Sequence, residues 1–268
     1  PDAPQPEELV SDADIHLIRS VAAQTGLALE NSELMVRIAA EIAQREKQKR
    51  ELEIAREVQQ RLFPQEHPPV PGLEYAGACR PAFEVGGDYY DFIQISETAF
   101  GIAIGDVSGK GVPGSLFMVV SKALYKSAAL RQARQVETLM REANVEISRE
   151  NGEGLFVTVL AGILDTRTGL LEYCNAGHEP PYLLPTGERP ILRLVDGGGP
   201  PLCAVDGFPY TASSLRLSPG DTVCLVTDGV TEAADAGGAL FGRERLETLL
   251  AKTGPGTSAA GVRERIRQ

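Results

Sequence analysis

The chain has 268 residues, of which 43% are hydrophobic, so it is long enough for one large domain or for a domain with an attachment. Its formal net charge is −11 and its sequence pI is about 4.9. A general nucleic-acid binder needs a basic face, so this charge argues against nucleic acid as a partner. No apolar stretch reaches the roughly 18 residues of a membrane span, and no signal peptide opens the sequence.

The four cysteines, Cys79, Cys174, Cys203 and Cys224, lie far apart and form no CxxC pair. Cys174 and Cys224 stand inside apolar runs. Free cysteine behaves as a small buried hydrophobe, and disulfides are rare in the cytosol. We therefore expect reduced core cysteines in a cytoplasmic protein.

A long helix is predicted from about Asp14 to Phe63, because this stretch has no proline, only one glycine, and mostly strong helix formers. Ser11 and Asp12 are candidate N-caps. Apolar residues recur at helical spacing at Ile15, Ile18, Ala22, Leu34, Ile38, Ile42, Leu52, Ala55, Val58 and Leu62. Such a helix cannot bury its apolar stripe alone, which favours a short, imperfect coiled coil with a second copy. The alternative is a helix folded back on its own domain.

The remainder of the chain predicts antiparallel sheets flanked by helices. Prolines from Pro64 onward end the long helix, and short β-like runs such as LEYAGACR, FGIAIGD, LFVTVLAGILD and TVCLVTD follow. Short turns at Thr166–Gly169 and Ser218–Asp221 favour hairpins. Helices are expected at about Val112–Ala133, Val136–Asn151 and Arg243–Lys252. The fold class is therefore α/β (α+β), an antiparallel β-sandwich with helices packed outside it.

Three acidic motifs carry the functional signal. Each places an aspartate beside glycine at the edge of an apolar run: Asp88 in VGGDYYD, Asp106 in IGDVSGKG and Asp228 in VTDGVTE. Where strands end and loops begin, such residues can meet at one sheet edge. Buried carboxylates repel one another unless a cation lies between them, and oxygen ligands suit magnesium or manganese. The three motifs together predict an enzyme with a carboxylate-held metal cluster.

Each motif alone has a simpler interpretation. Asp106 starts a glycine-rich loop in which the Val107 carbonyl is able to face a cation, but an ordinary Asx-turn explains it equally well. Asp228 followed by glycine is a common turn, and Asp88 is similar. His178, in NAGHEPP, is more often structural than a ligand when it stands alone in a turn. A shared metal site explains all three aspartates at once.

In order along the chain, RPAFEVGGDYYDF, IGDVSGKGVPGSLFM, LFVTVLAGILD, NAGHEPPYLL and LVTDGVTEAAD resemble the SpoIIE/RsbU-type bacterial serine/threonine phosphatases of the PPM (protein phosphatase 2C-like) superfamily. The preceding ELEIAREVQQRLFPQ is similar to the linker helix of that family, and residues 11–34 resemble the last helix of a GAF-type sensor domain. The expected organisation is a GAF tail at 1–34, a coiled-coil linker at 35–63 and a phosphatase domain at 64–268.

The resemblance implies a PPM-like αββα fold and a binuclear site. Asp106 would bridge two Mn²⁺ or Mg²⁺ ions, the Val107 carbonyl would assist one of them, Asp228 would bind one directly, and Asp88 would bind directly or through water. A water held by the ions would attack the phosphorus atom of a phosphoserine or phosphothreonine. The implied substrate is a phosphorylated STAS-type partner protein, with control through the N-terminal helix of a homodimer.

Two departures from the family pattern bear on activity. The family ends in an Asp-Asp motif that completes the metal site, whereas this sequence stops at Gln268 before any such motif, so we expect the phosphatase domain to lack its C-terminal end. Ser108 stands where eukaryotic relatives carry a histidine. The alternatives are an inactive PPM-fold interaction module and a metallohydrolase of small phosphoesters.

Overall fold

The structure is a computed structural model that describes residues 11–268 except 110, 132–134, 188 and 255. The chain divides into two compact units, residues 1–54 and 55–268. The first unit is helical from Asp12 onward, and every strand among the described residues lies in the second unit. The expected end of the second predicted helix, at Ala133, lies outside the described residues.

Helix α1 runs from Asp12 to Gln60, close to the predicted span. Ser11 caps it, because its hydroxyl accepts a hydrogen bond from the Asp14 amide at 3.3 Å while the Asp14 carboxylate accepts from the Ser11 amide at 3.0 Å. The helix ends three residues earlier than expected. Its last turn tightens into i→i+3 bonds, and Pro64 cannot continue it.

The second unit contains two antiparallel sheets. The five-stranded sheet has the order β1-β2-β3-β4-β7. Its strands are β1 Tyr89–Gln94, β2 Ala99–Val107, β3 Val157–Asp165, β4 Leu170–Ala176 and β7 Ser213–Arg216. The three-stranded sheet has the order β6-β5-β8. Its strands are β5 Tyr182–Leu184, β6 Leu192–Arg193 and β8 Thr222–Cys224.

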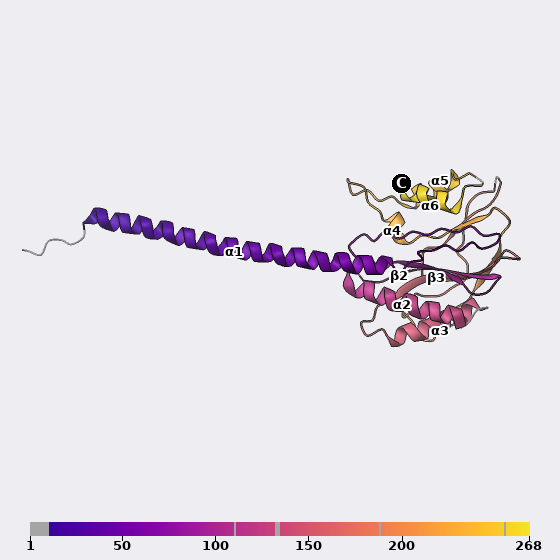
Figure 1. Ribbon diagram of the computed structural model, residues 1–268. Coiled ribbons are helices and arrows are strands. Elements are labelled where there is room, and N and C mark those ends of the chain that lie inside the picture. The colour runs from indigo at the N-terminus through magenta and orange to yellow at the C-terminus, as the bar shows by residue number, and fades with distance from the viewer. Residues whose placement is uncertain (1–10, 110, 132–134, 188, 255) are drawn as a thin grey trace, which may run out of the picture. The chain divides into compact units, whose positions relative to one another are not determined.

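Helices cover the outer face of each sheet (Figure 1). The helices over the five-stranded sheet are α2 Val112–Arg131 and α3 Val136–Arg149. Those over the three-stranded sheet are α5 Arg243–Ala251 and α6 Ala259–Arg267. The resulting order of helices, sheet, sheet and helices confirms the predicted αββα sandwich.

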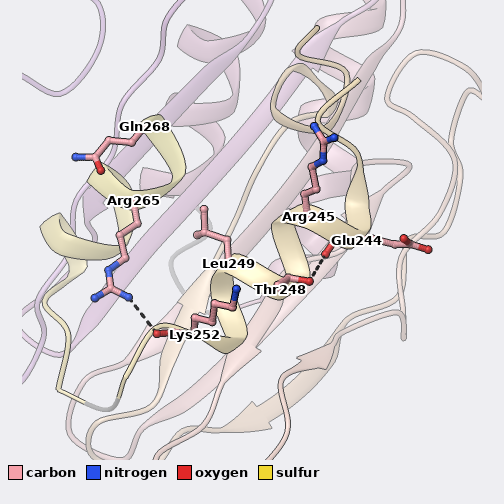
Figure 2. A pocket seen from close by; sticks show the side chains of 7 residues that line it. All are labelled: Glu244, Arg245, Thr248, Leu249, Lys252, Arg265 and Gln268. Carbon is pink, nitrogen blue, oxygen red and sulfur yellow. Dashed lines mark hydrogen bonds between the residues drawn. The ribbon is translucent and has the colours of Figure 1, made fainter. Parts of the chain in front are cut away.

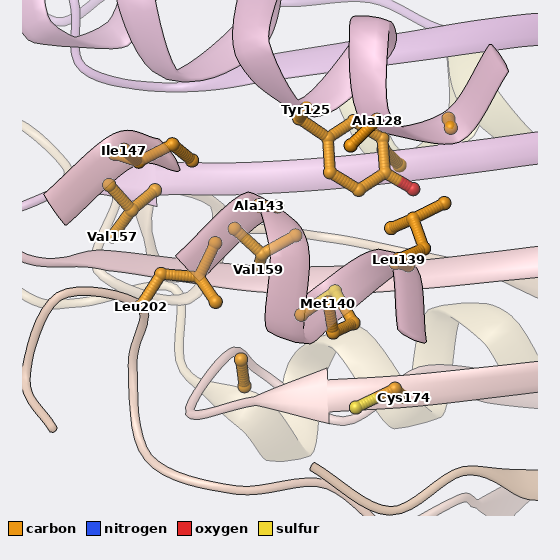
Figure 3. Close-up of a cluster of buried hydrophobic side chains, with 14 of the residues drawn as sticks. Tyr125, Ala128, Leu139, Met140, Ala143, Ile147, Val157, Val159, Cys174 and Leu202 are labelled. Atoms are coloured by element: carbon orange, nitrogen blue, oxygen red, sulfur yellow. The ribbon is translucent and has the colours of Figure 1, made fainter. Parts of the chain in front are cut away.

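Strand alternation decides which residues face the helices and which face the second sheet. Odd-numbered residues of β1, β2 and β3, such as Tyr89, Val107 and Val159, join the cluster formed with α2 and α3 (Figure 3). Leu164 and Leu171 pack instead with residues of β7 and β8, which places them between the sheets. A third cluster joins β5 and β8 to α5 and α6. Each fully buried aliphatic side chain contributes about 1.5–3 kcal/mol.

Two sequence predictions need correction, and two helices were not predicted. LEYAGACR, at 73–80, contributes only an isolated bridge through Leu73 and no strand. The turn Ser218–Asp221 links β7 to β8, which belong to different sheets, so it is not a hairpin turn. Helix α6 and the short helix α4, Asp228–Thr231, were not predicted. The hairpin turn Thr166–Gly169 between β3 and β4 is confirmed.

The remaining expectations concern cysteines and membranes. All four cysteines are free thiols, and Cys174 and Cys224 are buried as expected. In the described ranges of the chain, no helix combines the length and the apolarity that crossing a bilayer requires.

Candidate metal centre

Asp88 and Asp106 meet because of the pairing register of β1 and β2. Tyr89 lies opposite Gly105, so the antiparallel register brings Asp88, one residue before β1, opposite Asp106. Both residues have even numbers and therefore face the second sheet. Their carboxylates share a hydrogen bond. Asp106 lies inside β2, which ends at Val107, rather than just after the strand as predicted.

Gly87 lets these two segments approach closely. A Cβ atom at this position would lie 2.8 Å from the Val107 carbonyl oxygen and 3.4 Å from the Asp106 Oδ1 atom. Only a residue without a side chain fits there without moving the backbone. The glycine thus keeps a backbone carbonyl and a carboxylate together beside Asp88.

The segment after β8 that contains Asp228 lies beside Asp88. Strand β8 ends at Cys224, and Asp228 is the first residue of α4 rather than the last residue of a strand. The Thr227 hydroxyl donates a 3.0 Å hydrogen bond to the Asp88 Oδ2 atom. The negative charge of Asp228 acts on both Asp88 and Asp106. The structure therefore pairs Asp88 with Asp106 and brings the charge of Asp228 within electrostatic range of both.

The electrostatics of the site favour a bound cation. Burial, the charge and hydrogen bond of Asp88, and the charges of Asp228 and Glu232 together raise the pKa of Asp106 to about 7. Burial also raises the pKa of Asp88, opposed by its hydrogen bonds to Asp106 and Thr227. The pair therefore retains a proton near neutral pH unless positive charge replaces it.

The donor set fits a hard divalent ion, since it consists of carboxylate and carbonyl oxygens. Within residues 11–268, apart from the six undescribed positions, no three acidic, histidine or cysteine side chains are already gathered as a metal cluster. The arrangement is a hydrogen-bonded carboxylate pair with two further carboxylates in electrostatic range. This arrangement would allow a cation to replace the proton that Asp88 and Asp106 share.

His178 contacts Thr158, the residue that pairs with Asp106 on the neighbouring strand. Its ring Nδ1 lies 2.8 Å from the Thr158 hydroxyl, and Thr158 pairs with Asp106 across β2 and β3. Asn175 closes the turn by accepting from the His178 amide at 2.7 Å. Burial lowers the pKa of His178 to about 4, so the ring is neutral at physiological pH. These contacts agree with the structural interpretation of this histidine.

Ser108, which replaces the histidine of eukaryotic relatives, is also occupied. Its hydroxyl accepts a 2.8 Å hydrogen bond from the Phe156 amide, just before β3. The Ser108 side chain therefore fixes the start of the glycine-rich loop.

A separate hollow of about 600 Å³ lies between α5 and α6 (Figure 2). Its lining residues are Glu244, Arg245, Thr248, Leu249, Lys252, Arg265 and Gln268. None of the three aspartates lines it. Arg265 donates to the Lys252 carbonyl at 3.1 Å across the hollow, so part of its positive charge is engaged within the protein.

Residues 96–268 match the family model of stage II sporulation protein E (SpoIIE). The chain belongs to the SpoIIE family. This confirms the resemblance seen in the motifs, while the GAF-type relationship of the N-terminal helix stays a prediction.

Two curated relatives and one solved structure are similar to this SpoIIE-family chain. Protein IcfG of Synechocystis is 30% identical over 75% of this chain and 36% of its own length. Phosphoserine phosphatase RsbU of Bacillus subtilis is 30% identical over 80% of this chain and 62% of its own length. The chain thus spans only part of both relatives. The SiaA-PP2C domain of Pseudomonas aeruginosa has a TM-score of 0.66 at 21% identity, covering 83% of this chain and 87% of that domain, which shows the shared fold.

Several residues around the three aspartates were not predicted from the sequence. Thr227 and Glu232 flank Asp228 in the third motif, and both act on the carboxylate pair. Their closeness to Asp228 in sequence was the available signal. Gly87 was visible beside Asp88, but its contact with Val107 depends on the strand register.

The carboxylate pair predicts that manganese affinity depends on pH. The pKa of Asp106 is about 7 in the folded chain against 3.8 as the ordinary value, so the metal-free fold loses stability as the pH rises from about 4 through 7. Manganese must displace that proton. The dissociation constant of the manganese complex should therefore be about tenfold larger at pH 6 than at pH 8. Titration calorimetry at both values measures this. Equal affinities would contradict the shared proton, and an Asp106→Asn variant should show no such dependence.

Proposed function

We propose that the chain is a metal-dependent serine/threonine protein phosphatase. The observation that supports this most strongly is the pairing of the Asp88 and Asp106 carboxylates, with the charge of Asp228 acting on both. SpoIIE-family membership and a relative named phosphoserine phosphatase agree with it. Asp88, Asp106, Asp228 and the Val107 carbonyl would hold two Mn²⁺ or Mg²⁺ ions.

In this proposal the side chains of the site hold and position the ions. Bound ions would supply a water that ionises near neutral pH, and positive charge that stabilises the phosphoryl oxygens. Asp106 would give up its shared proton on binding them, and Thr227 orients the Asp88 carboxylate through its 3.0 Å hydrogen bond. His178 and Thr158 support the strand beneath Asp106. No side-chain nucleophile is required.

The proposed substrate is a phosphorylated STAS-type partner protein. Support comes from the family and from a relative, RsbU, named as a phosphoserine phosphatase. The net charge of −11 is unfavourable for nucleic acid as a substrate. The free thiols support a proposed cytoplasmic location.

The test is release of phosphate from a purified phosphoserine-containing STAS-type protein in the presence of manganese. We expect release that stops on chelation and returns when manganese is added again. Parallel reactions with para-nitrophenyl phosphate and with a nucleotide distinguish the alternative metallohydrolase. Manganese binding without turnover of any of the three substrates would instead favour an inactive interaction module.

We also propose that α1 forms a homodimer and transmits control to the site. Apolar side chains on α1 that lie largely exposed include Ile18, Leu34, Ile38 and Ile42. A helix of this length with an unburied apolar stripe is stabilised by pairing with a second copy. The assignment of 1–34 to a GAF tail and of 35–63 to a linker belongs to the same proposal.

The dimer proposal predicts that Ile38→Glu shifts the chain to a monomer, because a carboxylate would be placed in the paired seam. Sedimentation velocity at micromolar concentration measures the change. Ala40→Glu is the matched control, since it adds the same residue about half a turn away and should leave the dimer intact. A wild-type monomer, or an Ile38→Glu dimer, would contradict the proposal.

A further inference from the structure

Gln59 is the one buried residue of α1, a helix whose full span is described. It is 5% exposed, whereas its neighbour Val58 is 57% exposed. A polar amide inside a protein needs hydrogen-bond partners, and an apolar residue would normally occupy such a position. The contacts of this amide therefore call for an explanation.

Both polar atoms of the Gln59 side chain bind the same residue. Its Nε2 donates to the Gly86 carbonyl at 2.9 Å, and its Oε1 accepts from the Gly86 amide at 3.0 Å. Gly86 lies before the first residue of β1, so its backbone has no partner in the β1–β2 ladder. The side-chain amide thus takes the place of a neighbouring strand and fixes the backbone two residues before Asp88.

A second contact from the same end of the helix fixes the other side of Asp88. The ring of Phe63, three residues beyond α1, stacks on the ring of Tyr90, with centroids 5.4 Å apart and planes inclined by 21°. Tyr90 follows Asp88 by two residues. Gln59 and Phe63 therefore hold the chain at positions 86 and 90, with Asp88 midway between them.

We propose that Gln59 is a positioning residue that sets the geometry of Asp88 for the metal ions, and that it is the point where movement of α1 reaches the site. The inference rests on the proposed function. A shift or rotation of the last turn of α1 would break both hydrogen bonds to Gly86, because each depends on one planar amide. Asp88 would then lose its fixed approach to Asp106, and the affinity for manganese would fall.

The experiment compares Gln59→Met with wild type in the full chain. Methionine keeps nearly the same volume and removes both hydrogen bonds. We expect the Gly86 amide of the metal-free protein to exchange with solvent at least about tenfold faster, and the dissociation constant for manganese alone to weaken by about 10–100-fold, as for other residues that orient metal ligands. Gln60→Met, the exposed neighbour on the same helix, should change neither quantity.

A second variant covers the case in which Gln59→Met does not fold. Gln59→Glu keeps the acceptor for the Gly86 amide but places an oxygen against the Gly86 carbonyl, and it should weaken manganese binding in the same direction. Wild-type manganese affinity in a folded Gln59 variant would overturn the inference. Absence of manganese binding by wild type would instead overturn the proposed function, and the exchange of the Gly86 amide would still report whether Gln59 fixes that segment.

Discussion

The Asp106→Asn variant is expected to lose manganese-dependent phosphatase activity by about 10²–10³-fold or more, without losing stability in the absence of metal. Asparagine has almost the same size and retains a group that can donate to Asp88. Asparagine lacks the negative charge with which Asp106, beside Asp88, would balance the charge of the ions. Because burial and the neighbouring charges raise the pKa of Asp106 to about 7, removing its charge relieves repulsion in the metal-free fold.

Initial rates at saturating manganese measure the loss of phosphatase activity. Thermal unfolding in excess chelator measures the stability of the metal-free protein. Asp235→Asn is the matched control, since Asp235 lies in an exposed turn where its carboxylate accepts from the Gly237 amide at 2.8 Å. Activity within tenfold of wild type would remove Asp106 from the metal centre. A lower unfolding temperature for metal-free Asp106→Asn would contradict the repulsion between the carboxylates.

Gly198→Ala is expected to destabilise the fold by roughly 3 kcal/mol or more. Gly198 has a φ angle of +115°, and a Cβ atom there would clash with the backbone carbonyl of Asn175. That carbonyl already accepts the Gly199 amide at 3.0 Å, so it cannot move without losing a hydrogen bond. The damage would fall on the turn in which Asn175 fixes His178 beneath the metal centre.

Urea unfolding of the metal-free protein measures this difference. Gly207→Ala is the control, because Gly207 has a φ angle of +63° but no atom within 4 Å of its added Cβ. Its cost should be limited to about 1–2 kcal/mol of backbone strain. Similar losses for both variants would mean that the close approach at Gly198 contributes nothing.

Much of the architecture was predictable because it depends on local patterns. The uninterrupted helix formers before Pro64 predicted α1, and the turn Thr166–Gly169 predicted the hairpin of β3 and β4. The hairpin predicted at the turn Ser218–Asp221 was wrong, because a short turn can also connect strands of two different sheets. Strand β5 was not predicted, because three residues are too few to show a period and Tyr182 is buried through its packing against α5 and α6.

The site was predictable to the extent that its residues combine unusual chemistry with a local motif. Asp88, Asp106 and Asp228 stood out because each lies beside glycine at the edge of an apolar run, and one metal site explains all three. Gln59 gave no such signal, since glutamine is an ordinary helix former. Its role depends on a contact with Gly86, 27 residues away, that only the folded chain creates.

Diffraction at the manganese absorption edge, from crystals grown with manganese, tests the central claim most directly. Anomalous scattering locates the ions without assuming which side chains bind them. The expected result is strong anomalous density between the carboxylates of Asp88, Asp106 and Asp228, in contact with the Val107 carbonyl oxygen. Manganese bound elsewhere, with the Asp88 and Asp106 carboxylates still hydrogen-bonded to each other, would contradict the metal centre and the phosphatase mechanism built on it.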